Sequence, residues 1–176
     1  MPRRGEEHTY RAATPNGVVA AAGADMFFVI TGGTTREVRV RKLRVTGPLL
    51  TTLEVETIVA EKWSSAPTGG TATALTVVPL DSTQPATGAT LVQVYTAAPT
   101  QGTLIGTVAA RRGVFKSSTV VDGAPFFDTE FIFGDLPETK PIILRSAAQA
   151  LSLAFGAAPA TAVTLDVEVE WTEPGS

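Results

Sequence analysis

The chain has 176 residues, no cysteine, one histidine and a formal net charge of −3. This length suits one domain that buries about 70% of the surface of its unfolded chain, and the missing cysteines exclude disulfides and thiolate metal sites. The charge lacks the basic excess of a nucleic-acid-binding protein, and no apolar run approaches the ~18 residues of a membrane-spanning helix, so we expect neither partner.

The N-terminal third is expected to begin with an arm and continue as strands. Residues 1–9 are charged and predict a flexible arm that lacks the apolar core of a secretory signal, and a single domain is expected over 10–173. A strand-like pattern starts at Tyr10, and a short strand follows at 18–20. The apolar run Met26–Ile30, closed by glycines, indicates a strand that is buried on both faces.

Arg36–Thr46 alternates, but the apolar phase slips by one residue at Arg41-Lys42, which predicts a β-bulge. Gly47-Pro48 is interpreted as a turn into a second strand, Thr51–Trp63, so that the two strands would form a hairpin. Its exposed face would place arginines opposite glutamates, and opposite charges across strands stabilise a sheet. The residues concerned are Arg39, Arg41 and Arg44 on one strand and Glu54 and Glu56 on the other. Alternatively, this arginine row is a contact face for another subunit.

Residues 64–89 are rich in Thr, Ala, Gly and Pro and are predicted to form a long ordered loop. Such a loop is uncommon in a compact domain unless it has a function, and this one contains an apolar run, Leu75–Leu80. We hypothesise that it lies along its own sheet, covers an edge, and offers Val77, Val78 and Leu80 to a neighbouring subunit. The alternative is a lid over the domain's own core.

Further strands complete an all-β pattern without a helix. In the last of them, apolar residues face the core and Asp166, Glu168 and Glu170 form an acidic stripe. Many short alternating strands with Gly/Pro turns indicate an antiparallel β-sandwich, jelly-roll-like in form, with nine or ten strands. The remaining predicted strands are Leu91–Tyr95, Thr103–Ala110 ended by Arg111-Arg112-Gly113, Phe126–Phe133, Pro141–Leu144, 147–155 and Val163–Trp171. The alanines of 147–155 would also suit a helix, but Leu151, Leu153 and Phe155 alternate, which favours a strand.

No catalytic or metal site is legible. His8, the one histidine, falls in the predicted arm, where it is a poor base for a nucleophile. Asp128 and Glu130 share one face of a strand and have the spacing of a glycosidase pair, but a solvent-facing acidic row explains them equally well. Trp63 and Trp171 are in phase with core residues. No glycine-rich phosphate motif occurs, so we expect a non-enzymatic protein without cofactor or metal.

Several short sequence segments occur in a particular order along the chain. They are Phe27–Ile30 leading to Arg39–Gly47, then Gly69–Thr73 with Val78–Ser82 and Pro85–Thr87, then Pro141–Arg145 followed by Gln149, and finally Asp166–Trp171. In this order they resemble small virion proteins of tailed bacteriophages, most closely capsid decoration (cement) proteins.

The resemblance implies a structural protein that stabilises the capsid shell by binding the major capsid protein and copies of itself, as a dimer or trimer. It implies a place in the virion after assembly in the host cytoplasm. The resemblance maps no binding residue onto this chain, so the expected contact residues are those of the apolar run and the arginine row: Val77, Val78, Leu80, Arg39 and Arg41. Two other functions stay open, a neck, tail or baseplate module and a carbohydrate-binding sandwich, for which exposed aromatic side chains would be expected.

Overall fold

The computed structural model describes residues 7–15, 17–23, 25–50, 54–117, 127–134 and 139–175, and all regular structure in them is β-strand. The strands are β1 (Glu7–Ala13), β2 (Val18–Ala20), β3 (Met26–Thr31), β4 (Val38–Leu50), β5 (Glu54–Trp63), β6 (Thr71–Ala74), β7 (Val77–Pro79), β8 (Val92–Ala97), β9 (Leu104–Ser117), β10 (Asp128–Ile132), β11 (Ile142–Leu144), β12 (Ala150–Phe155) and β13 (Val163–Pro174).

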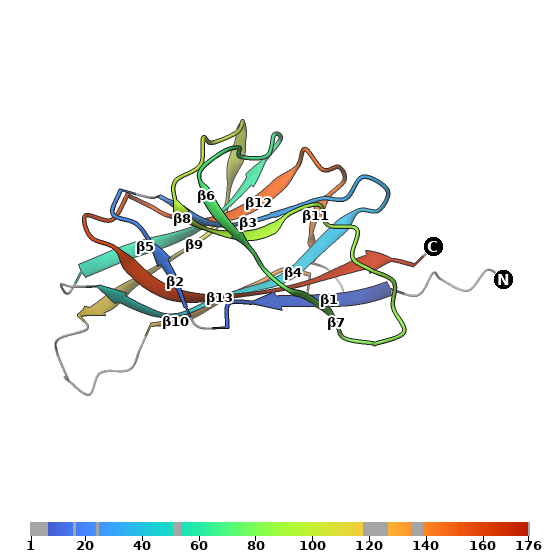
Figure 1. Ribbon diagram of the computed structural model, residues 1–176, viewed down its shortest axis with the longest axis horizontal. Helices are drawn as coiled ribbons and strands as arrows, with labels where there is room; N and C mark the ends of the chain where they lie inside the picture. The colour runs from blue at the N-terminus through green and yellow to red at the C-terminus, as the bar shows by residue number, and fades with distance from the viewer. Residues whose placement is uncertain are drawn as a thin grey trace.

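These strands form two antiparallel sheets that pack face to face (Figure 1). The first sheet has the order β7-β1-β13-β4, with β2 beside β13 and with β10 and β11 beside β4. The second sheet has the order β6-β8-β3-β12-β5-β9. The sheets are joined where the ends of β4 and β9 run parallel at Leu49–Leu50 and Lys116–Ser117. The predicted all-β sandwich is therefore confirmed.

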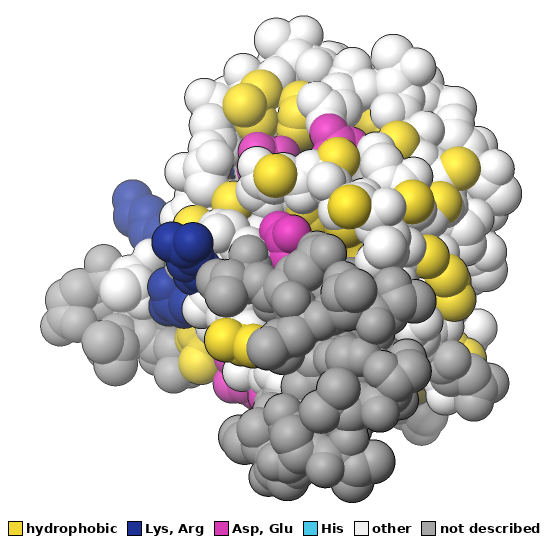
Figure 2. Space-filling model, turned by 90° about the vertical axis from the view of Figure 1, so that its left-hand side faces the viewer, with side chains coloured by type: hydrophobic (Ala, Val, Ile, Leu, Met, Phe, Trp, Pro, Cys, Tyr) yellow, Lys and Arg dark blue, Asp and Glu magenta, His cyan; other side chains and the backbone are white. Residues whose placement is uncertain are grey.

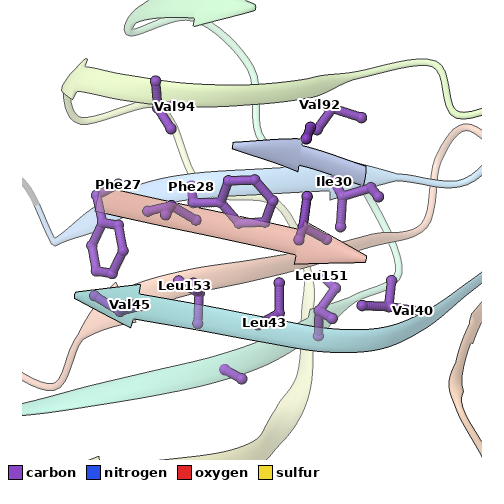
Figure 3. Close-up of a cluster of buried hydrophobic side chains, with 14 of the residues drawn as sticks. Phe27, Phe28, Ile30, Val40, Leu43, Val45, Val92, Val94, Leu151 and Leu153 are labelled. Atoms are coloured by element: carbon purple, nitrogen blue, oxygen red, sulfur yellow. The ribbon is translucent and has the colours of Figure 1, made fainter. Parts of the chain in front are cut away.

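The core lies between the sheets and follows the alternation of the sequence. On β13 the residues Val163, Leu165, Val167, Val169 and Trp171 are all buried, as predicted. Figure 3 shows side chains of β3, β8 and β12 meeting those of β4 across the gap between the sheets.

The second sheet is buried on both of its faces near its centre. Every residue of β3 and of β12 is buried. Part of each strand faces the main core, while Met26, Val29 and Ala150 belong to a smaller cluster with Trp63 and Tyr95. The continuous apolar run of β3 is thus explained by burial on both sides, as the sequence predicted.

The predicted bulge on β4 is confirmed, and the predicted turn after it is wrong. Glu170 pairs with Lys42 and Trp171 with Val40, so Arg41 is the extra residue. Gly47 does not end the strand: it adopts φ of 64° inside β4, where the register against β13 shifts again. A glycine with positive φ at a bulge lets the strand continue through Pro48 to Leu50.

The predicted hairpin of β4 and β5 is also wrong, because the two strands belong to different sheets. β4 pairs with β13 on one side, whereas β5 pairs with β12 and β9. Two segment boundaries differ as well. Residues 7–9, predicted as part of the arm, belong to β1, and β9 continues through Arg111-Arg112-Gly113 to Ser117. Residues 1–6 lie outside the described part of the chain.

The first and last strands are direct neighbours in the first sheet. β1 pairs antiparallel with β13 along its whole length, from Glu7 opposite Pro174 to Ala13 opposite Glu168. The described chain therefore enters and leaves the sandwich at the same end, on the right in Figure 1.

Candidate functional site

The segment predicted as a long loop supplies the last strand of each sheet on one side of the sandwich. Thr71–Ala74 form β6 against β8, and Val77–Pro79 form β7 against β1. Only Leu75 and Thr76 separate these strands, so the chain passes directly from one sheet to the other. The prediction that the segment covers an edge is confirmed. The prediction of a loop is wrong, because the edges of β8 and β1 give it pairing partners.

The apolar residues of this segment divide between the core and the surface. Leu75 and Val77 are partly buried and pack against the main core. Val78 is 53% exposed and Leu80 is 56% exposed. The lid interpretation therefore describes Leu75 and Val77, whereas Val78 and Leu80 are available for contact with another molecule.

A mainly apolar groove of about 540 Å³ lies beside Val78 and Leu80. Its one charged residue, Arg11, is held by β13, with its Nη2 atom 3.3 Å from Glu168 and 3.1 Å from Glu170. The charge is thus engaged within the sheet, and the groove offers methyl and methylene groups. Its lining comprises Arg11, Ala12, Ala13, Pro15, Thr73, Ala74, Leu75, Thr76, Val78 and Leu80.

A fully buried carboxylate, Glu173 on β13, fixes the chain that follows Leu80. The backbone N–H of Gly88 donates to both carboxylate oxygens at 2.9 and 2.8 Å. The Thr87 hydroxyl donates to Oε1 at 2.6 Å, and the Trp171 indole N–H donates to the same oxygen at 3.1 Å. A buried charge is tolerated when such donors surround it.

Two further side chains complete this anchor. Tyr10 stacks on Trp171 with the ring centroids 5.7 Å apart, and its hydroxyl donates to the Pro85 carbonyl at 2.9 Å. Burial, and then the nearby charge of Glu173, raise the pKa of Tyr10. Arg36 approaches the Glu173 carboxylate to 4.0 Å. The segment is therefore held by strand pairing at β6 and β7 and by this polar cluster beyond them.

The turn between Leu80 and the anchor is built on Asp81. Its carboxylate accepts hydrogen bonds from the Thr83 backbone N–H at 2.9 Å and from the Thr83 hydroxyl at 2.7 Å. Those hydrogen bonds lower the pKa of Asp81. This local arrangement is an Asx turn, which sets the direction of the chain directly after the exposed Leu80.

The predicted contact residues Arg39 and Arg41 are engaged within their own chain. Arg39 pairs with Glu37 and donates to Glu7 at 2.6 Å. Arg41 donates to Glu7 at 3.0 Å and to the Gly134 carbonyl at 2.9 Å. The paired surface expected for these arginines exists, but its acids come from β1 and the β3–β4 connection and not from β5.

Strand register places one row of outward residues across the first sheet. Val78 on β7 is followed by Arg11, Glu170 and Lys42 on the next three strands, and by Ile132 on β10. Val78 and Ile132, at the two rims, are more than half exposed. The middle of this face is ionic, and its exposed apolar groups lie at the rims.

The acidic pair Asp128 and Glu130 lies on this ionic face. Arg44 donates two hydrogen bonds to Asp128 at 3.0 and 2.6 Å, and Lys42 lies 2.6 Å from Glu130. The Arg44 guanidinium lowers the pKa of Asp128. A general acid needs the opposite shift, so the geometry favours the structural interpretation of this pair.

The other acidic residues and the tryptophans that the sequence singled out are likewise bonded within the chain. Within the acidic stripe, Glu168 and Glu170 pair with Arg11, and Asp166 accepts a hydrogen bond from the Thr14 hydroxyl at 2.9 Å. Trp63 and Trp171 are buried, and the Trp63 indole donates to Ser152 at 2.8 Å, so neither tryptophan can stack on a sugar. His8 belongs to β1.

Across the described residues there is no group of three or more His, Cys, Asp or Glu side chains placed to bind a metal ion. The same residues contain no helix of the length and apolarity needed to cross a membrane. No protein-family model, curated protein or solved structure matches this chain.

Sequence reasoning missed the anchor at Glu173, although a signal existed. The alternation of β13 was followed only to Trp171, and the next inward position after it is Glu173. A glutamate at an inward position of a core strand must find partners inside the protein. Its partners Thr87 and Gly88 are distant in sequence and carry no pattern that predicts the contact.

Proposed function

We propose that this chain is a non-enzymatic structural protein that binds other protein subunits through Val78, Leu80 and the adjoining groove. The observation that carries the proposal is two large aliphatic side chains, more than half exposed, on a segment that strand pairing and a buried anchor hold in place. Because the sequence resembles decoration proteins of tailed phages, we infer that the protein binds the outer shell of a capsid. Its partners there would be the major capsid protein and neighbouring copies.

The energetics suit a docking site. Burying a valine or leucine side chain fully contributes about 1.5–3 kcal/mol. Because the segment is already ordered, little conformational entropy is lost when a partner binds, and more of this free energy is expressed as affinity. Arg39 and Arg41 would act at the rim of such a contact, since their charges are already matched by Glu7 and Glu37 and exposed ion pairs contribute only about 0–1 kcal/mol.

Copy number in purified phage particles tests the assignment to the shell. A number comparable to that of the major capsid protein supports decoration of the head. A small number moves the protein to the neck, tail or baseplate. Complete absence refutes a virion function and returns attention to glycans, which a calorimetric titration would test.

A double substitution tests the contact residues themselves. Val78→Ser with Leu80→Ser should weaken co-sedimentation with shells that lack the protein by tenfold or more. Its stability should change little, because exposed positions usually tolerate substitution within about 0.5 kcal/mol each. Ile132→Ser is the matched control, since Ile132 is 55% exposed at the opposite rim of the same face. Equal binding by the double variant and the wild type would show that the groove is not the contact.

A further inference from the structure

β9 is a long edge strand, and among the described residues nothing pairs with its outer side over most of its length. It pairs with β5 from Leu104 to Phe115, and only Lys116 and Ser117 also pair with β4. No other strand of the described residues pairs with β9. On an edge strand, alternate residues direct their N–H and C=O groups away from the sheet, and these groups can pair with another chain.

The two halves of β9 differ in regularity. The register against β5 shifts between Ala60 and Glu61 and again between Lys62 and Trp63, so the first half of β9 is bulged. Bulges hinder the addition of another strand. From Ala109 to Phe115 the pairing with β5 is continuous. This stretch is long enough to pair with a strand of the usual length of about five or six residues.

The regular half packs against an aromatic ring and is partly apolar. The ring of Phe127 occupies the space beside Gly113, where a Cβ atom would overlap it. Val114 is 51% exposed. Figure 2 looks onto the end of the sandwich where β9 ends and shows hydrophobic side chains dispersed over this face, with Lys and Arg side chains gathered on one side.

Two arginines in this stretch differ from the other arginines that the structure describes. Each other arginine that the structure describes has a carboxylate within 4.0 Å. Arg111 and Arg112 have none among the described residues; Arg111 lies 5.8 Å from the centroid of the Phe131 ring. Being consecutive, they point to opposite faces of the second sheet. A strand added to β9 would therefore meet one positive charge on each of its faces.

We propose that the open edge of Ala109–Val114 binds an extended segment of another protein by strand addition. The segment would carry adjacent acidic residues opposite Arg111 and Arg112 and an apolar residue beside Val114. Backbone hydrogen bonds would give the affinity, and the two carboxylates would set the register, since opposite charges directly across strands are favourable. This edge is separate from the groove at Val78 and Leu80, and the proposal does not depend on it.

A second copy of this chain fits the edge poorly. Two copies of β9 that paired antiparallel over the whole regular stretch would have their two-fold axis at Arg112, the central residue of Ala109–Phe115. Each Arg112 would then face the other, and like charges directly opposite are destabilising. The charge pattern therefore selects an acidic partner of different sequence.

The test uses the full chain and a blocked peptide, acetyl-Thr-Val-Thr-Glu-Glu-Val-Thr-amide, with Lys-Lys replacing Glu-Glu in a second peptide. The acidic peptide should bind, shift the amide resonances of 109–114 and slow their hydrogen exchange. Arg111→Glu with Arg112→Glu should weaken this binding at least tenfold and bind the lysine peptide instead. Lys140→Glu with Arg145→Glu makes the same change of charge at two exposed sites and should leave binding unchanged.

Three results would overturn the proposal. One is failure of the acidic peptide to bind. Another is binding without slower exchange at 109–114, which would show ionic attraction without strand pairing. The last is concentration-dependent dimerisation in sedimentation that the Arg111→Glu, Arg112→Glu variant changes, because a second copy would then be the occupant.

Discussion

Replacing Glu173 by alanine is expected to destabilise the protein severely although the residue is charged and lies near the end of the last strand. The substitution removes the acceptor of three donors: the Gly88 N–H, the Thr87 hydroxyl and the Trp171 indole N–H. Trp171 is fully buried, so its indole N–H would have no replacement partner, whereas water can reach Thr87 and Gly88 in part.

The magnitude follows from those donors. A buried polar group left without a partner costs about 1–3 kcal/mol, more when the lost hydrogen bond involved a charge, and breaking a buried charged pair costs about 3–5 kcal/mol. We expect Glu173→Ala to reduce the free energy of unfolding by about 3–5 kcal/mol, measured by urea denaturation. For a chain of this length that loss lowers Tm by roughly 10 °C. Glu173→Gln keeps one acceptor oxygen and should cost about half as much.

Glu170→Ala is the matched control, because Glu170 lies on the same strand but points outward to Arg11. Loss of a surface ion pair costs about 0–1 kcal/mol. Limited proteolysis is a second measurement of the same effect. Glu173→Ala should increase the rate at which a protease cleaves the chain between Asp81 and Thr90. If Glu173→Ala proves no more harmful than Glu170→Ala, the anchor does not hold the segment and the reasoning fails.

Three further outcomes are expected. Gly113→Ala should cost about 1–3 kcal/mol because the new Cβ displaces the Phe127 ring, whereas Gly106→Ala on the same strand, which meets open space, should change stability by less than about 0.5 kcal/mol; equal effects in urea denaturation would contradict the placement of Phe127. Because Arg44 lowers the pKa of Asp128, their pairing should stabilise the fold above about pH 4 and fade as pH falls through the pKa of folded Asp128, and an NMR titration should show this pKa rising in Arg44→Met. Burial and then the charge of Asp25 raise the pKa of Glu61, so ionisation of this carboxyl opposes folding as pH rises above about 4.3; Glu61→Gln should therefore be more stable than wild type at pH 7 and equal to it at pH 3, and a destabilised variant at pH 7 would refute the assignment.

Strands whose own residue pattern shows which side is buried could be predicted from the sequence. The alternation of Val163–Trp171, the continuous apolar run Met26–Ile30 and the phase slip at Arg41 each have one physical explanation, and the structure confirms all three. Local periodicity records which side of a strand is buried, and it carries this information without knowledge of the neighbouring strand.

Pairing between strands could not be predicted in the same way. Arginines of β4 that seemed matched to Glu54 and Glu56 find Glu7, Glu37 and Asp128 instead, because charge complementarity does not identify which acidic segment is the neighbour. β6 and β7 escaped prediction for a related reason. Their residues have no strong strand pattern, and they become strands because the edges of β8 and β1 supply hydrogen-bonding partners.

Within the candidate site, the sequence identified the exposed apolar residues but not what holds them. The apolar run Leu75–Leu80 stands out among the Thr, Ala, Gly and Pro residues around it. Two of its members, Val78 and Leu80, are exposed. The open edge of β9 was hidden because Arg111-Arg112-Gly113 suggested the end of a strand.

The pairing of Glu7 with Pro174 also determines how the molecule would respond to force (Figure 1). Tension applied at these two neighbouring positions would pull β1 away from β13 like a zipper, with one pair of hydrogen bonds breaking after another. Strands loaded in this direction cannot share the strain along their length, as they would under shear. The fold is therefore mechanically weak between Glu7 and Pro174, so any larger load would have to pass through its faces and edges.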